Sequence, residues 1–276
     1  MTLSRIELED IGSPVELARL IHELDPNLPL AFGIEDLCRR LDISHIHEEA
    51  ISSFAAMLIM HADKAWGEIV LAKGTSPQRR RFSISHELGH FLIPSHRPRH
   101  GHRFSCSNAD LHMSDTGAAD HARRMEAEAN RFAAELLMPA RQIRSNLKSR
   151  QPDLAEIVRL AGEFNVSKAA MARSYVDAHR ATLALLVVRD GKIAQSHRPD
   201  DFPWIAPKIK EAVPQGSVFH EQPLRPGEIS EMEECDPEVW LGTSAARKVD
   251  ILGEQILAQR DDWAMILLHA ELNEEG

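Results

Sequence analysis

The stretch SPQRRRFSISHELGHFLIPSH, which runs from Ser76 to His96, decides how the rest of the chain is interpreted. Ser76 is a good helix N-cap, because its hydroxyl can accept a hydrogen bond from an N–H of the first turn, and Pro77 suits the first helical position. Pro94 cannot continue a helix. The sequence therefore predicts one helix from about Pro77 to about Leu92.

Two histidines and a glutamate on this helix form the pattern H-E-x-x-H. His86 and His90 are four residues apart, so they share one helix face, with their Cβ atoms about 5–6 Å apart. Glu87 is rotated off that face, where its carboxylate can reach a water bound at a metal rather than the metal itself. Gly89 costs roughly 1 kcal/mol relative to Ala inside a helix, so it indicates that another element packs closely there. Because the chain has 15 histidines, a chance match on an ordinary helix is the alternative.

A third ligand is predicted from a second helix in RMEAEANRFAAELLMP, residues 124–139. A catalytic zinc usually takes three protein ligands and leaves a fourth position to water. The apolar residues of this segment recur with a helical period: Met125, Ala129, Phe132, Ala133, Leu136 and Leu137. Glu126 lies just off the edge of this stripe and is the best candidate for the third ligand, although a solvated acid at a helix start is the alternative. Glu128 is the rival, pointing about two-fifths of a turn or more away.

At these two segments the sequence resembles the ImmA/IrrE zinc metallopeptidases, which belong to the broader group with a glutamate as third zinc ligand. The matching pieces are RRFSISHELGHFL and EAEANRFAAELLMP, in the family's order. The resemblance implies that His86, His90 and Glu126 bind one zinc ion per chain and that Glu87 is the general base. It covers about residues 14–180 and is weaker beyond them. A long histidine-rich loop between the motifs departs from the family pattern.

The expected fold is α+β and has three parts. Residues 1–140 form a mainly helical, zincin-like peptidase domain with a small sheet. Residues 141–180 form a helix-turn-helix-like helical segment, in which one helix starts near Asp153, the turn lies around Asn165, and Ser167 caps the second helix.

Residues 181–276 are expected to form a separate C-terminal α/β regulatory domain. Its strand pattern is compatible with the GAF-type sensor domain that some family members carry at this end. Asp190-Gly191 is a strong two-residue hairpin turn, and further strands are predicted in EVWLG, DILGEQILAQ and WAMILLHAEL. Residues 221–276 contain fourteen Asp or Glu and four Lys or Arg, so this part should not bind nucleic acid. A solvated acidic face without a function is the alternative.

Several elements are predicted before the metal helix. SPVELARLIHEL (residues 13–24) and GIEDLCRRLDI (residues 33–43) have the pattern of short amphipathic helices. SFAAMLIMHAD and AWGEIVLAKG are apolar runs joined by a short polar turn, which indicates a hairpin. Its edge strand could receive an extended peptide by strand addition, and a hairpin with a covered edge is the alternative.

The loop between the two motifs, residues 96–121, is rich in possible metal ligands: His96, His100, His102, Cys106, His112 and His121. Their spacing repeats no recognised zinc-finger pattern. A mobile lid over the active site is therefore preferred to a second zinc site, since loops this long are usually functional or disordered. Cys106 could bind the zinc as an inhibitory thiolate, although an ordinary small buried residue is the preferred interpretation. A structural zinc completed by Cys106 or His112 is a further alternative.

Composition is typical of a cytoplasmic protein. The chain has 276 residues, a formal net charge of −10 and three cysteines, which are too few and too widely spaced for a disulfide framework. The N-terminus MTLSRIELED carries charges where a signal peptide needs an apolar core. The longest apolar run, Phe54 to Met60, is too short to span a bilayer, so we expect no membrane attachment.

The expected function is that of a zinc-dependent endopeptidase with a regulatory tail. By resemblance, its substrate is a helix-turn-helix transcriptional repressor, cut to switch on a stress-response or mobile-element operon. The alternative is a non-proteolytic zinc-containing regulator that acts by binding protein or DNA. Residues 141–180 hold eight Lys or Arg and four Asp or Glu, a weak excess for direct DNA binding. Tyr175 could donate to an oxyanion near the zinc, although a place in the core is the simpler interpretation.

Overall fold

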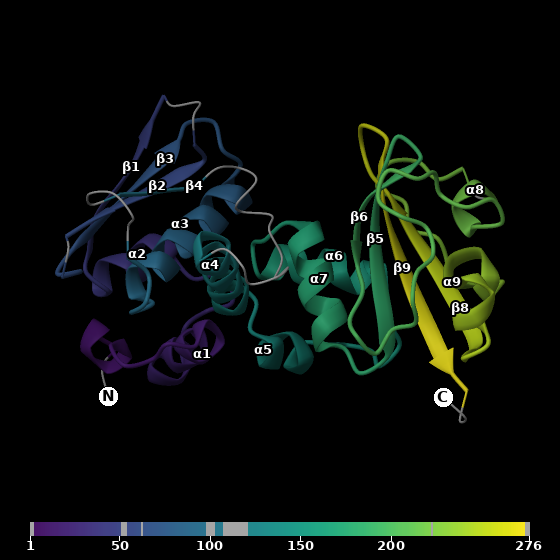
Figure 1. The fold of residues 1–276 in the computed structure, drawn as a ribbon, viewed down its shortest axis with the longest axis horizontal. Coiled ribbons are helices and arrows are strands. Elements are labelled where there is room, and N and C mark those ends of the chain that lie inside the picture. The colour runs from purple at the N-terminus through teal and green to yellow at the C-terminus, as the bar shows by residue number, and fades with distance from the viewer. Residues whose placement is uncertain are drawn as a thin grey trace. The chain divides into compact units, whose positions relative to one another are not determined.

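The computed structural model describes residues 3–50, 54–61, 63–97, 103–106, 121–221 and 223–273. These residues form a mixed α+β protein with two sheets (Figure 1), as the sequence predicts. Contacts divide the chain into two compact units. Unit 1 comprises residues 1–139 and 163–167, and unit 2 comprises residues 140–162 and 168–276.

Unit 1 contains the candidate metal-binding residues. Its helices are the 3-10 helix η1 (Arg5–Leu8), α1 (Pro14–Leu24), α2 (Ile34–Arg40), α3 (Pro77–Leu92) and α4 (His121–Leu137). Its strands are β1 (Ile43–Glu49), β2 (Ala56–Met60), β3 (Gly67–Ala72) and β4 (Arg103–Cys106). Helix α3 has the predicted bounds, because the Ser76 side chain accepts a hydrogen bond from the Arg79 N–H and Pro77 occupies the first turn.

The sheet of unit 1 has the strand order β1-β3-β2-β4. Strands β2 and β3 form the predicted antiparallel hairpin. Strand β1 pairs with β3 in parallel, and β4 pairs with β2 in antiparallel fashion. Both hairpin strands therefore lie inside the sheet, and the prediction that one of them offers a free edge for a peptide is wrong. The predicted helix over residues 33–43 is also too long, because the chain turns at Asp42, whose φ is 66°, and then enters β1.

Helix α3 lies between the sheet and α4. It contacts β2 and β3 on one side and α4 on the other, while α4 also packs against α1 (Figure 1). The buried residues of α4 are the six predicted for its apolar stripe: Met125, Ala129, Phe132, Ala133, Leu136 and Leu137. A helix covered on both sides explains why nearly all of the second half of α3 is buried.

Unit 2 consists of a helical segment followed by a sheet. Its helices are α5 (Ala140–Ser145), α6 (Leu154–Glu163), α7 (Lys168–Ala178), α8 (Val218–Glu221) and α9 (Pro237–Ala246). Its strands are β5 (Thr182–Arg189), β6 (Lys192–His197), β7 (Glu233–Cys235), β8 (Val249–Ala258) and β9 (Trp263–Leu272). The sheet is antiparallel in the order β6-β5-β9-β8-β7. Asp190 and Gly191 form the predicted hairpin turn, with φ values of 50° and 69°.

The prediction of a strand in EVWLG is wrong, since this stretch belongs to α9. Asp236 is the N-cap of that helix, its side chain accepts a hydrogen bond from the Glu238 N–H, and Pro237 occupies the first turn. Trp240 on this helix is fully buried in the core of unit 2, and its indole N–H donates to the Glu254 carboxylate at 3.0 Å. A Ser/Thr/Asp cap followed by proline is thus a stronger signal than the β-propensity of valine and tryptophan.

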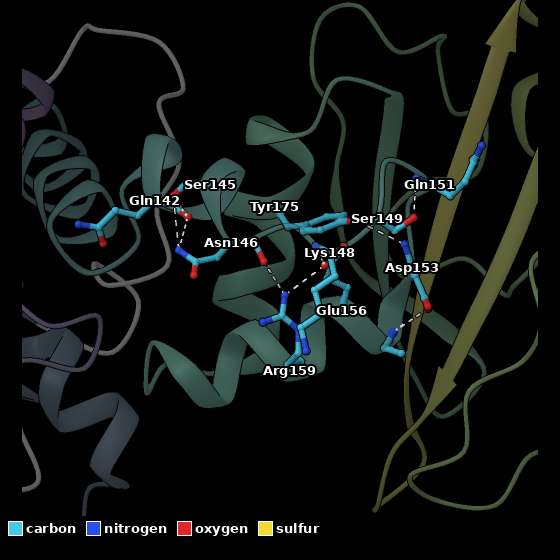
Figure 2. Close-up of polar contacts among 11 residues, drawn as sticks. Gln142, Ser145, Asn146, Lys148, Ser149, Gln151, Asp153, Glu156, Arg159 and Tyr175 are labelled. Carbon is cyan, nitrogen blue, oxygen red and sulfur yellow. Dashed lines mark hydrogen bonds and ion pairs between the residues drawn. The ribbon is translucent and has the colours of Figure 1, made fainter.

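The two helices predicted after residue 153 are present as α6 and α7, and Asn165 between them has a φ of 52°. Within unit 2, α7 packs against β5 and α5. The Tyr175 side chain is fully buried, and its hydroxyl accepts a hydrogen bond from the Asp153 N–H at 3.3 Å (Figure 2). Tyr175 therefore has the core position that the sequence favoured.

Polar contacts join this helical segment to the sheet of unit 2. Gln255 of β8 accepts a hydrogen bond from the Leu154 N–H at 2.7 Å, and its amide donates to Asp153 at 3.0 Å. Glu156 of α6 accepts from the Lys148 N–H at 2.5 Å and from Arg159 at 3.1 Å (Figure 2). The loop before α6 is thereby held to α6, and the start of α6 is held to β8.

The part of the chain that the structure describes contains no helix that is both long enough and apolar enough to cross a membrane.

Candidate metal centre

Two neighbouring helices of unit 1 bring together His86, His90 and Glu126. The His86 and His90 Nε2 atoms are 3.2 Å apart. The Glu126 carboxylate lies 3.2 Å from His86 Nε2 and 3.4 Å from His90 Nε2. One possible ligand atom from each residue lies within 4.8 Å of the other two, and this is the only such group of three among the described residues. The three side chains can therefore hold a metal ion.

Gly89 explains how α4 comes close enough to present Glu126. A Cβ atom at this position would lie 2.9 Å from Cδ1 of Phe132 and 3.4 Å from Cα of Ala129, both on α4. A hydrogen in place of a side chain is therefore what allows the two helix backbones to approach. The packing reason that the sequence indicated for this glycine is present.

Replacing Gly89 by Ala should separate α3 from α4, because Phe132 is fully buried and cannot move away freely. We expect a loss of about 1–3 kcal/mol in stability together with weaker zinc binding. Gly162 of α6 is the matched control, since a Cβ there meets nothing within 4 Å. Gly162→Ala should stabilise by roughly 0.4–1 kcal/mol. Thermal melting and zinc titration of both variants check this, and equal behaviour of the two would contradict the packing argument.

The surroundings of His86 fix which of its nitrogens faces the cluster. His86 Nδ1 donates a hydrogen bond to Asn130 Oδ1 at 3.0 Å. When His86 is neutral, this leaves a lone pair on Nε2, which faces His90 and Glu126. A hydrogen-bond acceptor on the far nitrogen is the usual partner of a metal-binding histidine.

Burial and charge act in opposite directions on this cluster. Burial lowers the pKa of His90 to about 4. Burial also opposes the charge of His86, but the Glu126 hydrogen bond and the Glu87 carboxylate outweigh it and raise the pKa of His86. Burial raises the pKa of Glu126, yet the two imidazoles outweigh it and lower that pKa. Without a metal, the ligand cluster thus favours a protonated His86 beside an ionised Glu126, and a cation that binds here must displace that proton.

Glu87 lies on α3 directly after His86, and its side chain is fully buried. It is not a member of the group of three possible ligands. Its carboxylate is close enough to His86 for its charge to influence the pKa of that imidazole. A carboxylate beside the possible ligands, but not among them, suits a group that takes or gives a proton.

Lys64 is a residue of this region whose role the sequence did not indicate. Its side chain is buried, and its ammonium donates to the carbonyls of His90 at 3.1 Å and Ile93 at 2.6 Å. Burial, with the nearby charges of Arg97 and Arg5, lowers the pKa of Lys64 to about 7. Lys64 satisfies carbonyls that the end of a helix leaves without partners, and it thereby holds the end of α3 that carries His90.

Glu128, the rival for the third ligand, contacts other groups. Its carboxylate lies 2.9 Å from His96 Nε2 and 2.8 Å from Arg124 Nε. His96 belongs to the histidine-rich stretch, and it is fully buried against His90. The spacing from His86 to His96 is that of H-E-x-x-H-x-x-G-x-x-H, with Ile93 in the place of the glycine, and this spacing could have drawn attention to His96. His100, His102 and His112 of the predicted lid lie outside the described residues, as does the side chain of Cys106.

These features define an α+β domain in which an H-E-x-x-H helix and a carboxylate from a second helix form a group that could hold a metal ion. Residues 51–174 match the IrrE N-terminal-like domain, a domain of the metallopeptidase type, and this match supports membership of the ImmA/IrrE family. None of the curated proteins matches the sequence. A solved structure named Mycobacterium tuberculosis transcriptional regulator is similar, with a TM-score of 0.54 and 16% identity over 96% of this chain and 92% of that chain. At this identity the likeness concerns the fold alone.

Proposed function

We propose that this protein is a zinc-dependent endopeptidase that cleaves a helix-turn-helix transcriptional repressor and thereby derepresses a stress-response or mobile-element operon. The observation that carries the enzymatic part is the convergence of His86, His90 and Glu126, with the carboxylate of Glu87 next to them in the chain. Two imidazoles and one carboxylate suit zinc. The choice of substrate rests on the family alone.

The mechanism follows from the roles that these side chains can take. A bound zinc ion would lower the pKa of a water molecule and polarise the carbonyl of the peptide bond to be cut. Glu87 accepts the proton of the attacking water and then passes it to the leaving amine. Asn130 accepts from His86 Nδ1 and so favours the neutral tautomer in which the Nε2 lone pair could bind the metal. The Glu126 side chain is 15% exposed, whereas both histidine side chains are fully buried, so solvent reaches the group of three on the carboxylate side.

The finer features of the fold belong to the same proposal. We assign a zincin-like arrangement to unit 1, which is supported by α3 lying against the sheet with α4 beside it. We assign a GAF-like sensor role to the C-terminal sheet, which is supported by its five antiparallel strands and by the core that they form with α9. The sensor would tune the peptidase without supplying catalytic groups, because the group of three possible ligands lies entirely in unit 1.

Removing zinc tests the enzymatic proposal. The purified full chain is incubated with a candidate helix-turn-helix repressor, and the intact repressor band is followed. A chelator that removes zinc should abolish cleavage, and stoichiometric zinc should restore it, whereas magnesium should not. Cleavage that continues at full rate in protein shown to lack metal would contradict the proposal.

A second candidate function is that of a regulator that keeps the zinc site and acts by binding alone. This candidate is motivated by the name of the solved structure with a similar fold, a transcriptional regulator. The two candidates differ in one result. The regulator would relieve repression in cells while the repressor stays intact, and the peptidase would relieve repression only as the intact repressor disappears.

A further inference from the structure

His96 contacts the side of His90 that faces away from the group of three possible ligands. His96 follows the end of α3, and its backbone N–H donates a hydrogen bond to the Ile93 carbonyl at 3.1 Å. The Nδ1 atoms of His96 and His90 are 3.0 Å apart, and the ring centroids are 4.9 Å apart. On its other side, His96 Nε2 lies 2.9 Å from Glu128 Oε2. The His96 side chain is fully buried, so all of these contacts are inside the protein.

The positions of the protons in the hydrogen-bonded series Glu128–His96–His90 follow from the chemistry of the Glu128 carboxylate. The Glu128 carboxylate can only accept, so His96 Nε2 carries a hydrogen and donates it. A neutral His96 then has a lone pair on Nδ1, which must accept from His90 Nδ1–H. His90 consequently has no hydrogen on Nε2, the nitrogen that faces His86 and Glu126. His90 is therefore in the tautomer with a hydrogen on Nδ1 and a lone pair on Nε2, which is the tautomer that can bind a metal through Nε2.

His96 itself is poorly placed to be a ligand, although its spacing from His90 is that of a third zinc-binding histidine. Its nearest ring nitrogen faces His90 Nδ1, not the His90 Nε2 that meets His86. The position of the third ligand is taken by Glu126, which contacts both histidines.

We propose that His96 and Glu128 are positioning residues that hold His90 in the tautomer and ring orientation needed to bind the metal. This inference rests on the metal site of the proposed function, but not on proteolysis. Carboxylate-to-histidine partners of this kind typically contribute 10–100-fold to metal affinity. His96 and Glu128 would do for His90 what Asn130 does for His86.

Zinc affinity of the full chain, measured by competition with a chromophoric chelator, tests the proposal. His96→Leu removes the acceptor and should weaken zinc binding by about 10–100-fold. His96→Asn should recover much of this loss, because its amide oxygen can take the place of Nδ1. Arg124→Gln is the matched control: Arg124 also contacts Glu128, but its side chain is 67% exposed, and zinc affinity should stay unchanged.

Two further measurements separate positioning from a purely structural role. Nitrogen NMR of the metal-free protein should find the His90 proton on Nδ1 in the wild type and distributed over both nitrogens in His96→Leu. Melting of the metal-free variants shows whether His96→Leu simply fails to fold, in which case His96→Asn carries the comparison. Wild-type zinc affinity in folded His96→Leu would overturn the proposal, and so would a zinc site in which X-ray absorption finds three imidazoles. If the wild type binds no zinc at all, the metal site itself fails, and the proposed function fails with it.

Discussion

Glu87→Gln is expected to reduce peptide-bond cleavage by about 10²–10⁴-fold, which is the usual contribution of a general base. Glutamine has nearly the same shape as glutamate, so it fits the fully buried position, but it cannot take a proton from the attacking water. Zinc content should stay at the wild-type level, because Glu87 is not one of the three proposed ligands.

The experiment is co-expression of each variant with the candidate repressor, following the intact repressor band, with metal content and melting temperature measured in parallel. Glu68→Gln is the matched control, since Glu68 lies on β3, outside the proposed site, and this variant should cleave like the wild type. If wild type and Glu87→Gln relieve repression equally and neither cuts the repressor, the protein acts by binding, and the regulator replaces the peptidase.

The two helices that carry the proposed site were predictable because their signals are local. Ser76 and Pro77 set the start of α3, and the six apolar residues of α4 define the face that the structure buries. The sequence also predicted that another element packs closely at Gly89, because a glycine within a helix lowers its stability and therefore indicates a packing role. The structure adds that Phe132 and Ala129 are the residues that approach.

Other elements could not be predicted because long-range pairing decides them. Strand β1 has few buried residues, and it forms by pairing in parallel with β3. No local pattern in the sequence of β1 predicts this pairing. The same pairing removes the free hairpin edge that the sequence suggested. The sequence also treated the helices after residue 140 and the C-terminal sheet as separate parts. In the structure their contacts group them in one compact unit, in which Gln255 of β8 accepts a hydrogen bond from the start of α6.

The groups around the possible ligands were the hardest to predict. Lys64 belongs to a turn far from His90 in the sequence, and only the fold brings its ammonium to the end of α3. His96 lies at the start of the histidine-rich loop, and the spacing of that whole set matches no zinc-finger pattern. Its individual role was therefore not predictable from the spacing. Asn130 carries no signal of its own, as a single asparagine on a helix is unremarkable until its partner is known.

The proposed set of ligands predicts a large loss of bound zinc when one ligand is replaced. The Glu126→Gln and His90→Ala proteins should each be purified without stoichiometric zinc. Loss of a direct ligand should weaken binding beyond the 10–100-fold that is typical of supporting residues. Glu128→Gln is the matched control for Glu126→Gln, since it makes the same chemical change two residues away on α4. Its amide oxygen can still accept from His96, so this variant should retain zinc.

Metal analysis of the purified full-length variants gives the answer, with one equivalent of zinc expected in the wild type and in Glu128→Gln. The distances support this outcome, because Glu126 lies within 3.4 Å of both His86 and His90, whereas Glu128 contacts His96 and Arg124. Zinc lost from Glu128→Gln but kept by Glu126→Gln would exchange the roles of the two glutamates. Two equivalents in the wild type would instead indicate a second site, for which the histidines of the loop between the two motifs are the available ligands.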